Sequence, residues 1–560
     1  MYPDTRSTIH GMHIFIAFLL GPALLSLWPA SGEAAQLPTL PQTFIDTTYS
    51  PPSGNTIVVN AGGNLQTAIN NAVLGDTIVL QAGATFTGPF TLPNKTSGSG
   101  WIYIQSSAYA SLPPPGTRVA ISDATNMPII EGTAAGTSAI FTADTAHHFR
   151  FVGIQFRPKA GDNIFTLISL GNADTSTTTM PHDITFDRCY IHGDPTVGGT
   201  RGVAMNGPSI AVVESYVSDF KETGNDTQAL WSYNSPGPLK IVNNYLEASG
   251  ENFMSGGAGP AMVNLVPSDI EIRRNHFAKP LSWVPLTWGV KNLLEFKNGR
   301  RVLVEGNIFE NCWASAQSGF AVQITPRNDN GTSPWEAVQD ITIRLNKFIN
   351  VGQGIAMLGK DNGGAGGTTL VLDRVLIENN LILVQDIASE DHRIFQVLNS
   401  AAFSGAGPNN LTVRHNTGLI LSVGSGSPGA TAVSEMLGVK ADLLDFRDNL
   451  FSAGSAGYGF LGSGTASGTP TLTAYYTNYT MTNNAFIQGV GSYPANNFFP
   501  SNNAAVGFVN FAGGNYALAS TSSLHNAASD GTDIGANIAA ITAAISGVSS
   551  LVAPRNLRVQ

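Results

Sequence analysis

Charged side chains are scarce in this chain. Asp, Glu, Lys and Arg make up 12% of its 560 residues, about half of the roughly 25% that is usual in soluble domains. Long solvated helices held by ion pairs are therefore not expected. The 38 acidic residues outnumber the 28 basic ones. The resulting net charge of −10 argues against a nucleic-acid partner, which would require a basic field.

Long apolar runs are lacking beyond the N-terminus. The run Met12–Trp28 follows Arg6, and small residues around Ala34 come after it. This order is typical of a secretory signal peptide cut near Ala34. The run is short for a membrane span and is interrupted by Gly21–Pro22. We therefore expect a signal peptide over residues 1–34, a secreted or cell-surface protein, and no membrane span in the mature chain.

A repeat is present from about residue 150 onward. A short strand, a polar turn position and another short strand recur, and their turn positions can be aligned. These positions are Ile154, Cys189, Ser215, Asn244, Asn275, Asn307, Asn346, Asn380, Asn416, Asn449 and Asn484. They cover 330 residues in ten steps, with a mean of 33. A period in this range indicates a solenoid, a propeller or an array of repeats.

The pattern inside each repeat favours strands. Ankyrin and tetratricopeptide arrays have similar periods, but apolar and polar residues alternate here with period two, as at Val302, Val304 and Ile343. A propeller would need four strands per blade and a more constant repeat length. A further strand before each Asn gives three strands per coil. The sequence therefore predicts an all-β parallel β-helix whose asparagines form one hydrogen-bonded turn ladder.

Both ends of the solenoid need covering elements. Asn64–Val73 has an N-cap residue and amphipathic spacing, which predicts a short capping helix. Ile538–Ile545 is Ala-rich and compatible with a helix. We therefore divide the mature chain into a leader segment (35–54), the β-helix (55–540) and a C-terminal helix or linker (541–560).

The two cysteines are Cys189 and Cys312. In an exported protein, two cysteines suggest a disulfide. The repeat places them four coils apart, about 19 Å along the axis, whereas a bridge needs Cα atoms within roughly 7 Å. Two free thiols are predicted.

Three stretches carry a resemblance to a known family. The segment LQTAINNAVLGDTIVLQAGATFTGPFTL, the VxNNxF-type coils and the closing DGTDIGA resemble the pectate-lyase-like, right-handed parallel β-helix superfamily, over about residues 55–540. The resemblance implies a single-stranded, right-handed β-helix with a short N-terminal capping helix. It does not fix the reaction, because this superfamily holds lyases, hydrolases, esterases and non-enzymatic surface proteins. The final APRNLRV resembles the opening strand of a fibronectin type III module, but is too short to form a domain.

The chain also resembles β-helix alginate and dermatan lyases. It lacks the Asp-Asp pair and Gly-His-Gly turn of polygalacturonases and the signatures of pectin methylesterases, whereas Glu295–Asn298 followed by Asn307 is similar to a lyase segment. In those lyases the Lys of this segment is the base and an Arg one coil later assists, which implies Lys297 and Arg327. The acidic pair that holds calcium in those enzymes is not reproduced, since Lys291–Asn292 occupies that stretch. A calcium cofactor therefore stays open.

The chemistry of β-elimination explains this choice of residues. Cleavage of a uronic-acid polymer requires removal of the proton beside a carboxylate, so a cation must neutralise the developing enolate while a base reaches the proton. Lys or Arg can serve in either role if neighbouring cations lower its pKa. Strand alternation points one set of side chains to solvent. This set contains the catalytic candidates Glu295, Lys297 and Arg327 and the substrate-binding candidates Gln323 and Thr325.

The alternative is that these residues form an ordinary solvated sheet surface, with Arg327 anchoring the following loop. Aromatic residues near the same coils could stack on sugar rings or pack the turns. They are Trp231, Tyr233, Trp283 and Trp288. Isolated carboxylates could also hold calcium, although no ligand spacing requires it. They are Asp219, Glu222, Asp226, Glu247 and Glu251.

Two classes of function follow. The first is a secreted polysaccharide lyase that cleaves an acidic, uronic-acid-containing glycan by β-elimination. The second is a non-catalytic extracellular β-helix that binds a glycan or another surface partner. The oligomeric state is left open.

Overall fold

The computed structural model describes residues 34–132, 137–329, 331–361, 368–399, 407–424, 427–436 and 439–548. The predicted signal peptide, apart from its last residue, and the segment after 548 lie outside these residues. Within the described ranges, no helix has both the length and the apolar character needed to cross a bilayer.

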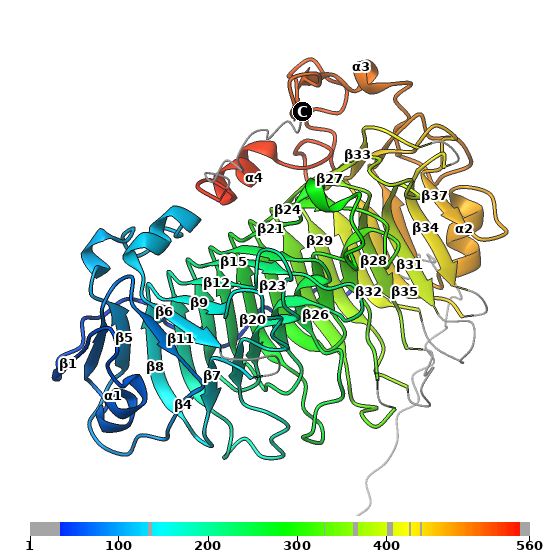
Figure 1. Ribbon diagram of the computed structural model, residues 1–560. Coiled ribbons are helices and arrows are strands. Elements are labelled where there is room, and N and C mark those ends of the chain that lie inside the picture. The colour runs from blue at the N-terminus through cyan, green and yellow to red at the C-terminus, as the bar shows by residue number, and fades with distance from the viewer. Residues whose placement is uncertain are drawn as a thin grey trace, which may run out of the picture. The chain divides into compact units, whose positions relative to one another are not determined.

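Nearly all of the described strands form three long parallel sheets (Figure 1). The 14-stranded sheet contains β1 (Thr56–Val59), β2 (Thr77–Leu80), β5 (Ile102–Ser106), β8 (His147–Val152), β11 (His182–Asp187), β14 (Ile210–Val213), β17 (Leu239–Val242), β20 (Ser268–Arg273), β23 (Gly299–Glu305), β26 (Val338–Arg344), β29 (Asp373–Glu378), β32 (Asn409–Arg414), β35 (Asp442–Arg447) and β38 (Tyr479–Thr482). The 13-stranded sheet contains β3 (Thr85–Thr87), β6 (Ile129–Gly132), β9 (Gln155–Pro158), β12 (Tyr190–His192), β15 (Tyr216–Phe220), β18 (Tyr245–Ala248), β21 (His276–Ala278), β24 (Ile308–Cys312), β27 (Lys347–Val351), β30 (Leu381–Val384), β33 (Thr417–Ile420), β36 (Leu450–Ser452) and β39 (Ala485–Ile487).

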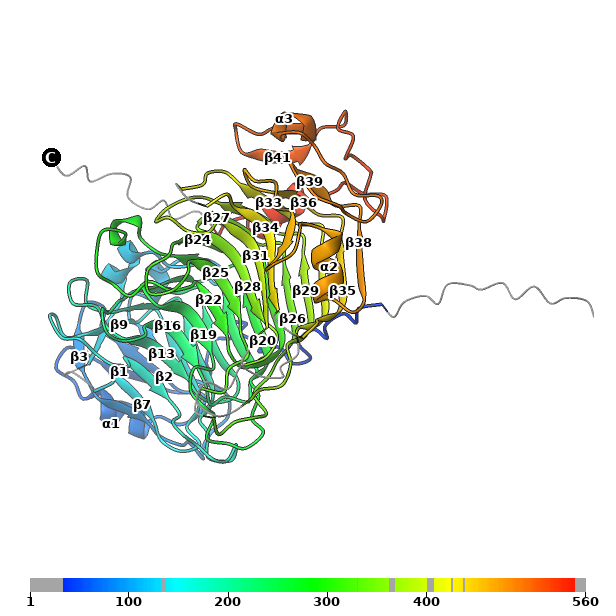
Figure 2. The ribbon, with the colours of Figure 1, turned by 90° about the vertical axis from the view of Figure 1, so that its right-hand side faces the viewer.

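The 12-stranded sheet carries the candidate site, and Figure 2 shows many of its strands side by side. It contains β4 (Phe90–Leu92), β7 (Ile140–Thr142), β10 (Ile168–Leu170), β13 (Arg201–Met205), β16 (Gln228–Ser232), β19 (Glu251–Ser255), β22 (Leu294–Phe296), β25 (Phe320–Ile324), β28 (Gln353–Leu358), β31 (Arg393–Asn399), β34 (Ala430–Met436) and β37 (Phe460–Gly462). Each strand pairs with its counterpart one coil away. The chain is thus the predicted all-β, right-handed parallel β-helix.

Inward side chains stack from coil to coil. Phe277, Phe309 and Phe348 are buried at equivalent positions of β21, β24 and β27, with ring centroids 4.8 and 4.7 Å apart. This distance matches the spacing of neighbouring strands, about 4.8 Å. Period-two alternation in the sequence therefore becomes continuous apolar rows inside the solenoid, and burial of each such ring contributes roughly 1.5–3 kcal/mol.

The predicted asparagine ladder is confirmed. Asn346 Nδ2 donates to Asn380 Oδ1 at 3.0 Å, and Asn346 Oδ1 accepts from the backbone amide of Asn307 at 2.9 Å. The same pattern runs through the ladder positions Asn244, Asn275, Asn307, Asn346, Asn380, Asn416, Asn449 and Asn484. It continues to Asn497, which the repeat alignment did not include. Because each amide serves two neighbours, the buried turns keep their polar groups satisfied.

The two ends are covered differently. Helix α1 (Leu65–Asn71) is the predicted N-terminal cap, and Asn64 Oδ1 accepts from the Thr67 amide at 2.9 Å. Lys95 Nζ donates to the carbonyls of Ile69 and Ala72 near the other end of α1, at 2.6 Å each. At the C-terminal coils, α2 (Thr469–Tyr475) packs on β37.

The segment after the last coil covers part of an outer face. It contains α3 (Asn503–Val506), the antiparallel pair of β40 (Phe508–Asn510) and β41 (Asn515–Leu518), and α4 (Ile538–Ala544). Residues of this segment pack with outward leucines of the 13-stranded sheet, including Leu383 and Leu419. Helix α4 is the Ala-rich helix predicted from the sequence. It lies along the turns, where the Arg274 side chain donates to its Ala544 carbonyl, and it does not close the final coil.

Short 3₁₀ helices occur in three connections. They are η1 (Tyr109–Ser111), η2 (Ile121–Asn126) and η3 (Leu281–Trp283).

Both cysteines are free and buried, as predicted. Cys189 occupies the turn before β12, and Cys312 ends β24. The sheet order β12-β15-β18-β21-β24 places them four coils apart.

Candidate functional site

The candidate site lies on the outer face of the 12-stranded sheet. Leu294 and Phe296 of β22 are buried in the core, so the residues between and after them face outward. Glu295 pairs in register with Met254 of β19 and Gln323 of β25. Alternation along the strand was therefore predicted correctly.

The sequence predicted that the Glu295 side chain reaches solvent, but the side chain is buried. Its relative exposure is 3%, and it accepts hydrogen bonds from Thr325 Oγ1 and Asn292 Nδ2, both at 3.2 Å. Burial, reinforced by the charge of Glu251, raises the pKa of Glu295 to about 7. The prediction was wrong because side chains from adjacent coils and connections cover an outward strand position.

Lys297 is mostly covered but still reaches the surface. Its side chain is 17% exposed, and Nζ lies 3.7 Å from Asp329 Oδ1. Burial by itself would lower the pKa of Lys297, but the carboxylates of Glu295, Asp329 and Glu251 raise it overall. The surroundings are thus acidic, opposite to the cationic surroundings that would favour a neutral lysine.

Arg327 lies one coil beyond Lys297, as predicted. Its backbone amide donates to the Lys297 carbonyl at 3.0 Å. Its guanidinium donates to Asp361 Oδ1 at 3.1 Å, and the side chain is 40% exposed. The same strand region places Gln323 Nε2 against Gln317 Oε1 at 2.8 Å, while Thr325 is buried.

A second set of charges lies on neighbouring coils of the same sheet. Lys291 forms ion pairs with Asp226 and with Glu251 Oε1, the latter at 3.7 Å. Glu251 Oε2 accepts from Gln228 Nε2 at 2.8 Å, and Gln228 Oε1 accepts from Arg201 Nε at 2.9 Å. The lysine that replaces an acidic residue here is therefore a counterion for two carboxylates.

The carboxylates considered for calcium do not converge. Asp219 pairs with Lys221 at 2.8 Å, and Glu222 accepts from Asn163 at 2.8 Å. Glu247 accepts from Tyr245 on the 13-stranded sheet at 2.9 Å. Among the residues that the structure describes, these carboxylates are not part of a metal-sized group of ligand atoms.

Two of the four candidate aromatic residues join the site. The rings of Trp231 and Tyr233 stack at 4.6 Å, and Arg201 lies over Trp231 at 3.8 Å. Trp231 Nε1 donates to the Gly256 carbonyl at 2.8 Å. Gly256 has φ +97°, and a Cβ there would lie 2.8 Å from Lys297 Cβ. Glycine therefore allows the backbone at this position to lie close to Lys297.

The other two aromatic residues pack a turn. Trp283 is 5% exposed and clusters with Val290 and Trp313, and Trp288 packs against them. Lys221 Nζ lies 5.6 Å from the Trp283 ring and 5.8 Å from the Trp288 ring. These contacts favour the packing alternative for this pair.

Glu336 was not singled out from the sequence. It is 1% exposed, and its Oε1 has no hydrogen-bond partner among the described residues. Burial and the nearby charges of Asp329 and Asp361 raise its pKa to about 9. Because Glu336 lies in a long connection without periodicity, the sequence carries no signal of its burial.

No family model matches this chain, and no curated protein matches it. Among solved structures it is similar to an alginate lyase from Paenibacillus sp. str. FPU-7, at 13% identity and a TM-score of 0.27, over 73% of this chain and 98% of that one. It is also similar to the catalytic unit of a GH87 α-1,3-glucanase from Streptomyces thermodiastaticus strain HF3-3, at 13% identity and a TM-score of 0.49, over 81% and 71% of the two chains.

A third similar structure is the PL6 family alginate lyase AlyGC, at 13% identity and a TM-score of 0.41, over 79% of this chain and 53% of that one. The fold is established by the structure itself, from the three parallel sheets and the asparagine ladder of the described residues. The chain has a right-handed parallel β-helix fold.

Proposed function

We propose that this protein binds an acidic glycan on the outer face of the 12-stranded sheet and cleaves it by β-elimination. The observation that carries the proposal is the pairing of Lys297 and Arg327, two cations from successive coils joined by a 3.0 Å backbone hydrogen bond. Both side chains reach the surface. Trp231 of the stacked Trp231–Tyr233 pair donates to the carbonyl of Gly256, which lies against Lys297. Cations next to an aromatic surface suit a chain of charged sugar rings.

In this proposal the Arg327 guanidinium receives the uronate carboxylate, and neutral Lys297 takes the proton beside it. The guanidinium and the ammonium that Lys297 then becomes stabilise the enolate that forms. The C–H electron pair becomes the new carbon–carbon double bond, and the glycosidic oxygen leaves with the proton that Lys297 took up. Lys297 serves as the base only after losing its own proton, so the elimination rate should rise with pH toward its elevated pKa. Glu295 is a positioning residue whose charge holds the Lys297 ammonium.

The second candidate is glycan binding without cleavage. Its specific support is the raised pKa of Lys297, because a lysine that stays protonated at neutral pH suits carboxylate binding better than proton abstraction. In both cases we propose an acidic polysaccharide as the partner and an extracellular location.

The test measures ultraviolet absorbance of unsaturated uronate products over pectate, alginate and glycosaminoglycans, with and without calcium, from pH 6 to 10. We expect product formation that rises with pH on one polymer class and falls at least about 100-fold in Lys297→Ala and Arg327→Ala. Lys347→Ala, on the 13-stranded sheet, is the matched control. Glu295→Gln should move the rising limb to lower pH, because it removes a charge that raises the pKa of Lys297.

A binding assay on the same polymers separates the two candidates. Binding that depends on Lys297 but yields no unsaturated product at any pH supports the binding module and overturns the lyase. Full activity in Lys297→Ala would show that the site assignment is wrong.

A further inference from the structure

A cluster of imidazoles lies on a different sheet from the candidate glycan site. His147 and His148 begin β8, and His182 and Asp183 begin β11, the next strand of the 14-stranded sheet. His147 and His182 are register partners, and their rings stack at 5.0 Å with an interplanar angle of 3°. Two neighbouring coils therefore bring four possible ligand side chains to one place.

Backbone geometry turns consecutive residues toward each other. In a regular strand, successive side chains point to opposite faces. His148 has φ +57° and Asp183 has φ +53°, which breaks this alternation at both strands. As a result, His148 Nδ1 lies 2.7 Å from His147 Nδ1, and Asp183 Oδ2 lies 2.6 Å from His182 Nδ1.

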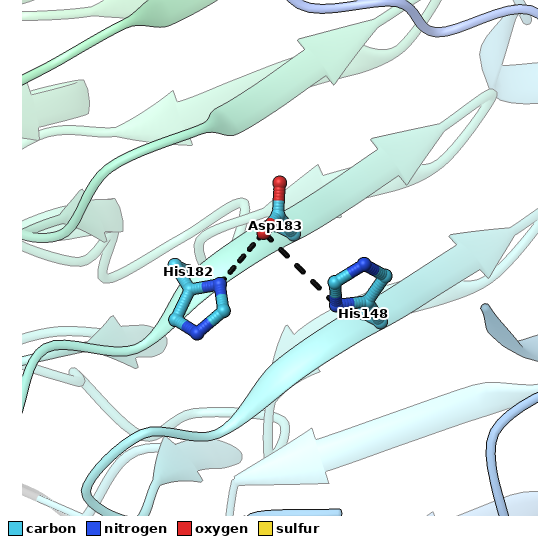
Figure 3. A group of neighbouring side chains, drawn as sticks. All are labelled: His148, His182 and Asp183. Carbon is cyan, nitrogen blue, oxygen red and sulfur yellow. Dashed lines mark hydrogen bonds and ion pairs between the residues drawn. The ribbon is translucent and has the colours of Figure 1, made fainter. Parts of the chain in front are cut away.

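Three donor atoms converge across the two strands. Asp183 Oδ2 lies 4.0 Å from His148 Nδ1 as well as 2.6 Å from His182 Nδ1 (Figure 3). One ligand atom from each of these three residues falls within 4.8 Å of the other two. Ligands bound to tetrahedral zinc at about 2.0–2.1 Å lie roughly 3.3 Å apart. Small side-chain rotations bring the observed distances to this value, since each side chain is about one-third exposed.

Neighbouring groups hold the cluster in place. His147 Nε2 lies 2.9 Å from the Lys95 carbonyl oxygen, which only accepts hydrogen bonds, so this nitrogen carries a proton. In neutral His147 the lone pair is then on Nδ1, where it accepts the Nδ1 proton of His148 while no metal is bound. The Trp101 ring packs against His148 at 5.1 Å. Such outer contacts orient metal-binding imidazoles.

We propose that His148, His182 and Asp183 bind one divalent transition-metal ion of the Zn²⁺ type, which joins two neighbouring coils. Two imidazoles and one carboxylate form a donor set that suits zinc and related ions rather than calcium, which takes oxygen ligands. When the ion binds Nδ1 of His148 and of His182, the single ring proton of each neutral imidazole lies on Nε2. A fourth position remains for water, with His147 beside it as a positioning residue.

The protonation state of His148 is consistent with ligation. Burial lowers the pKa of His148, and the charges of His147 and His182 lower it further, against the opposing charge of Asp183. A neutral imidazole is the form that binds a metal ion.

A second group, of two carboxylates and one histidine, already uses carboxylate oxygens to accept hydrogen bonds. Asp386, Glu390 and His392 also lie close together. However, the Glu390 carboxylate accepts hydrogen bonds from the backbone amides of Ala314, Ile387 and Ala388. Its oxygens already stabilise a loop, and we assign it no metal.

The experiment is calorimetric titration of the EDTA-treated, dialysed protein with ZnCl₂ at pH 7.5, and separately with CaCl₂. We expect one zinc site per chain and no comparable binding of calcium, because two of the three ligand atoms are nitrogens. His182→Gln and Asp183→Asn should weaken this site at least about tenfold. His525→Gln is the matched control, because His525 pairs with Asp533 at the same 2.6 Å distance on another part of the chain.

A spectroscopic measurement on the unmutated protein tests the metal site independently of whether the variants fold. Co²⁺ should give visible absorption bands of a low-coordinate nitrogen and oxygen site, and added Zn²⁺ should remove them. No zinc binding up to millimolar concentration, or binding that persists unchanged in both variants, would overturn the proposal. Preferential binding of Ca²⁺ at these residues would do the same.

Discussion

The carboxyl group of Glu336 has an unusually high pKa. Its burial and the neighbouring Asp329 and Asp361 raise its pKa to about 9, while the positive charge of Lys297 opposes this. Near neutral pH the folded protein keeps the carboxyl proton and the unfolded chain loses it. The folded state is therefore penalised as the pH rises above the ordinary glutamate pKa.

Replacing Glu336 with Gln should remove that penalty. We expect Glu336→Gln to be more stable than the unmutated protein at pH 8, by roughly 1–3 kcal/mol. Near pH 4 the two proteins should be equally stable, because the glutamate is then protonated in both states. Chemical denaturation at the two pH values measures the difference.

The exposed carboxylate variant Asp144→Asn is the control and should show no such gain. A stability difference for Glu336→Gln that is the same at pH 4 and pH 8 would contradict the burial of a protonated carboxyl group.

At the candidate site, the sequence predicted which way the side chains point, but not which of them other parts of the chain cover. The period-two pattern correctly placed Glu295 of β22, and Lys297 directly after this strand, on the outer face of the sheet. Whether an outward side chain meets water depends on connections from other coils, and these varied in length without a repeating pattern. The acidic surroundings of Lys297 come from Asp329 and Glu251, which are far apart in the sequence.

The asparagine ladder is the clearest element-scale feature. Asn346 is fully buried, and its side chain takes part in four hydrogen bonds, to Asn380, to the Val304 carbonyl, and from the amide and side chain of Asn307. Each bond links one coil to another, so losing the side chain removes a partner from groups in both neighbouring coils.

We expect Asn346→Ala to lower the free energy of unfolding by roughly 2–4 kcal/mol, because it leaves buried donors and acceptors unsatisfied. Asn350→Ala is the matched control in the same coil. Its side chain is half-buried and donates to Asn311 Oδ1. Denaturant midpoints of the two variants should differ clearly, and equal midpoints would show that the ladder adds little to stability.

At the scale of the whole molecule, the segment before the first strand fastens many coils. The amides of Gln36, Thr39 and Gln42 donate to Asn410, Asp340 and Asp269, on β32, β26 and β20. Each step of three residues along this segment therefore spans two coils. An extended three-residue turn of polyproline type rises about 9.3 Å, close to two coil spacings of about 4.8 Å.

Two carboxylates hold this segment in a pH-dependent way. Burial alone would raise the pKa of Asp340, but hydrogen bonds from Arg374 and from the Thr39 amide lower it overall. Asp269 has the same balance, with Arg301 and the Gln42 amide as its partners. A lowered folded-state pKa gives stability that is present above the unfolded value, about 3.9. That stability is lost as the pH falls through the folded value.

Hydrogen exchange of residues 36–48 tests this attachment. At pH 7, Asp340→Ala should speed exchange of the Thr39 amide by roughly tenfold relative to the unmutated protein. As the pH falls through the lowered pKa of Asp340, the two proteins should come to exchange alike, because the carboxylate of the unmutated protein becomes protonated. A variant with unchanged exchange at pH 7 would show that these contacts do not hold the segment.

The sequence by itself determined the repeat, and through it the β-helix, the ladder and the free thiols. These features follow from local periodicity, since each coil repeats the same alternation and the same turn residue. Only the tertiary structure decided which outward residues are covered, as at Glu295, and where the ends pack, as for α4 along the turns. It also brought His148 beside Asp183, because contacts between coils depend on register and on left-handed backbone positions that have no local sequence signature.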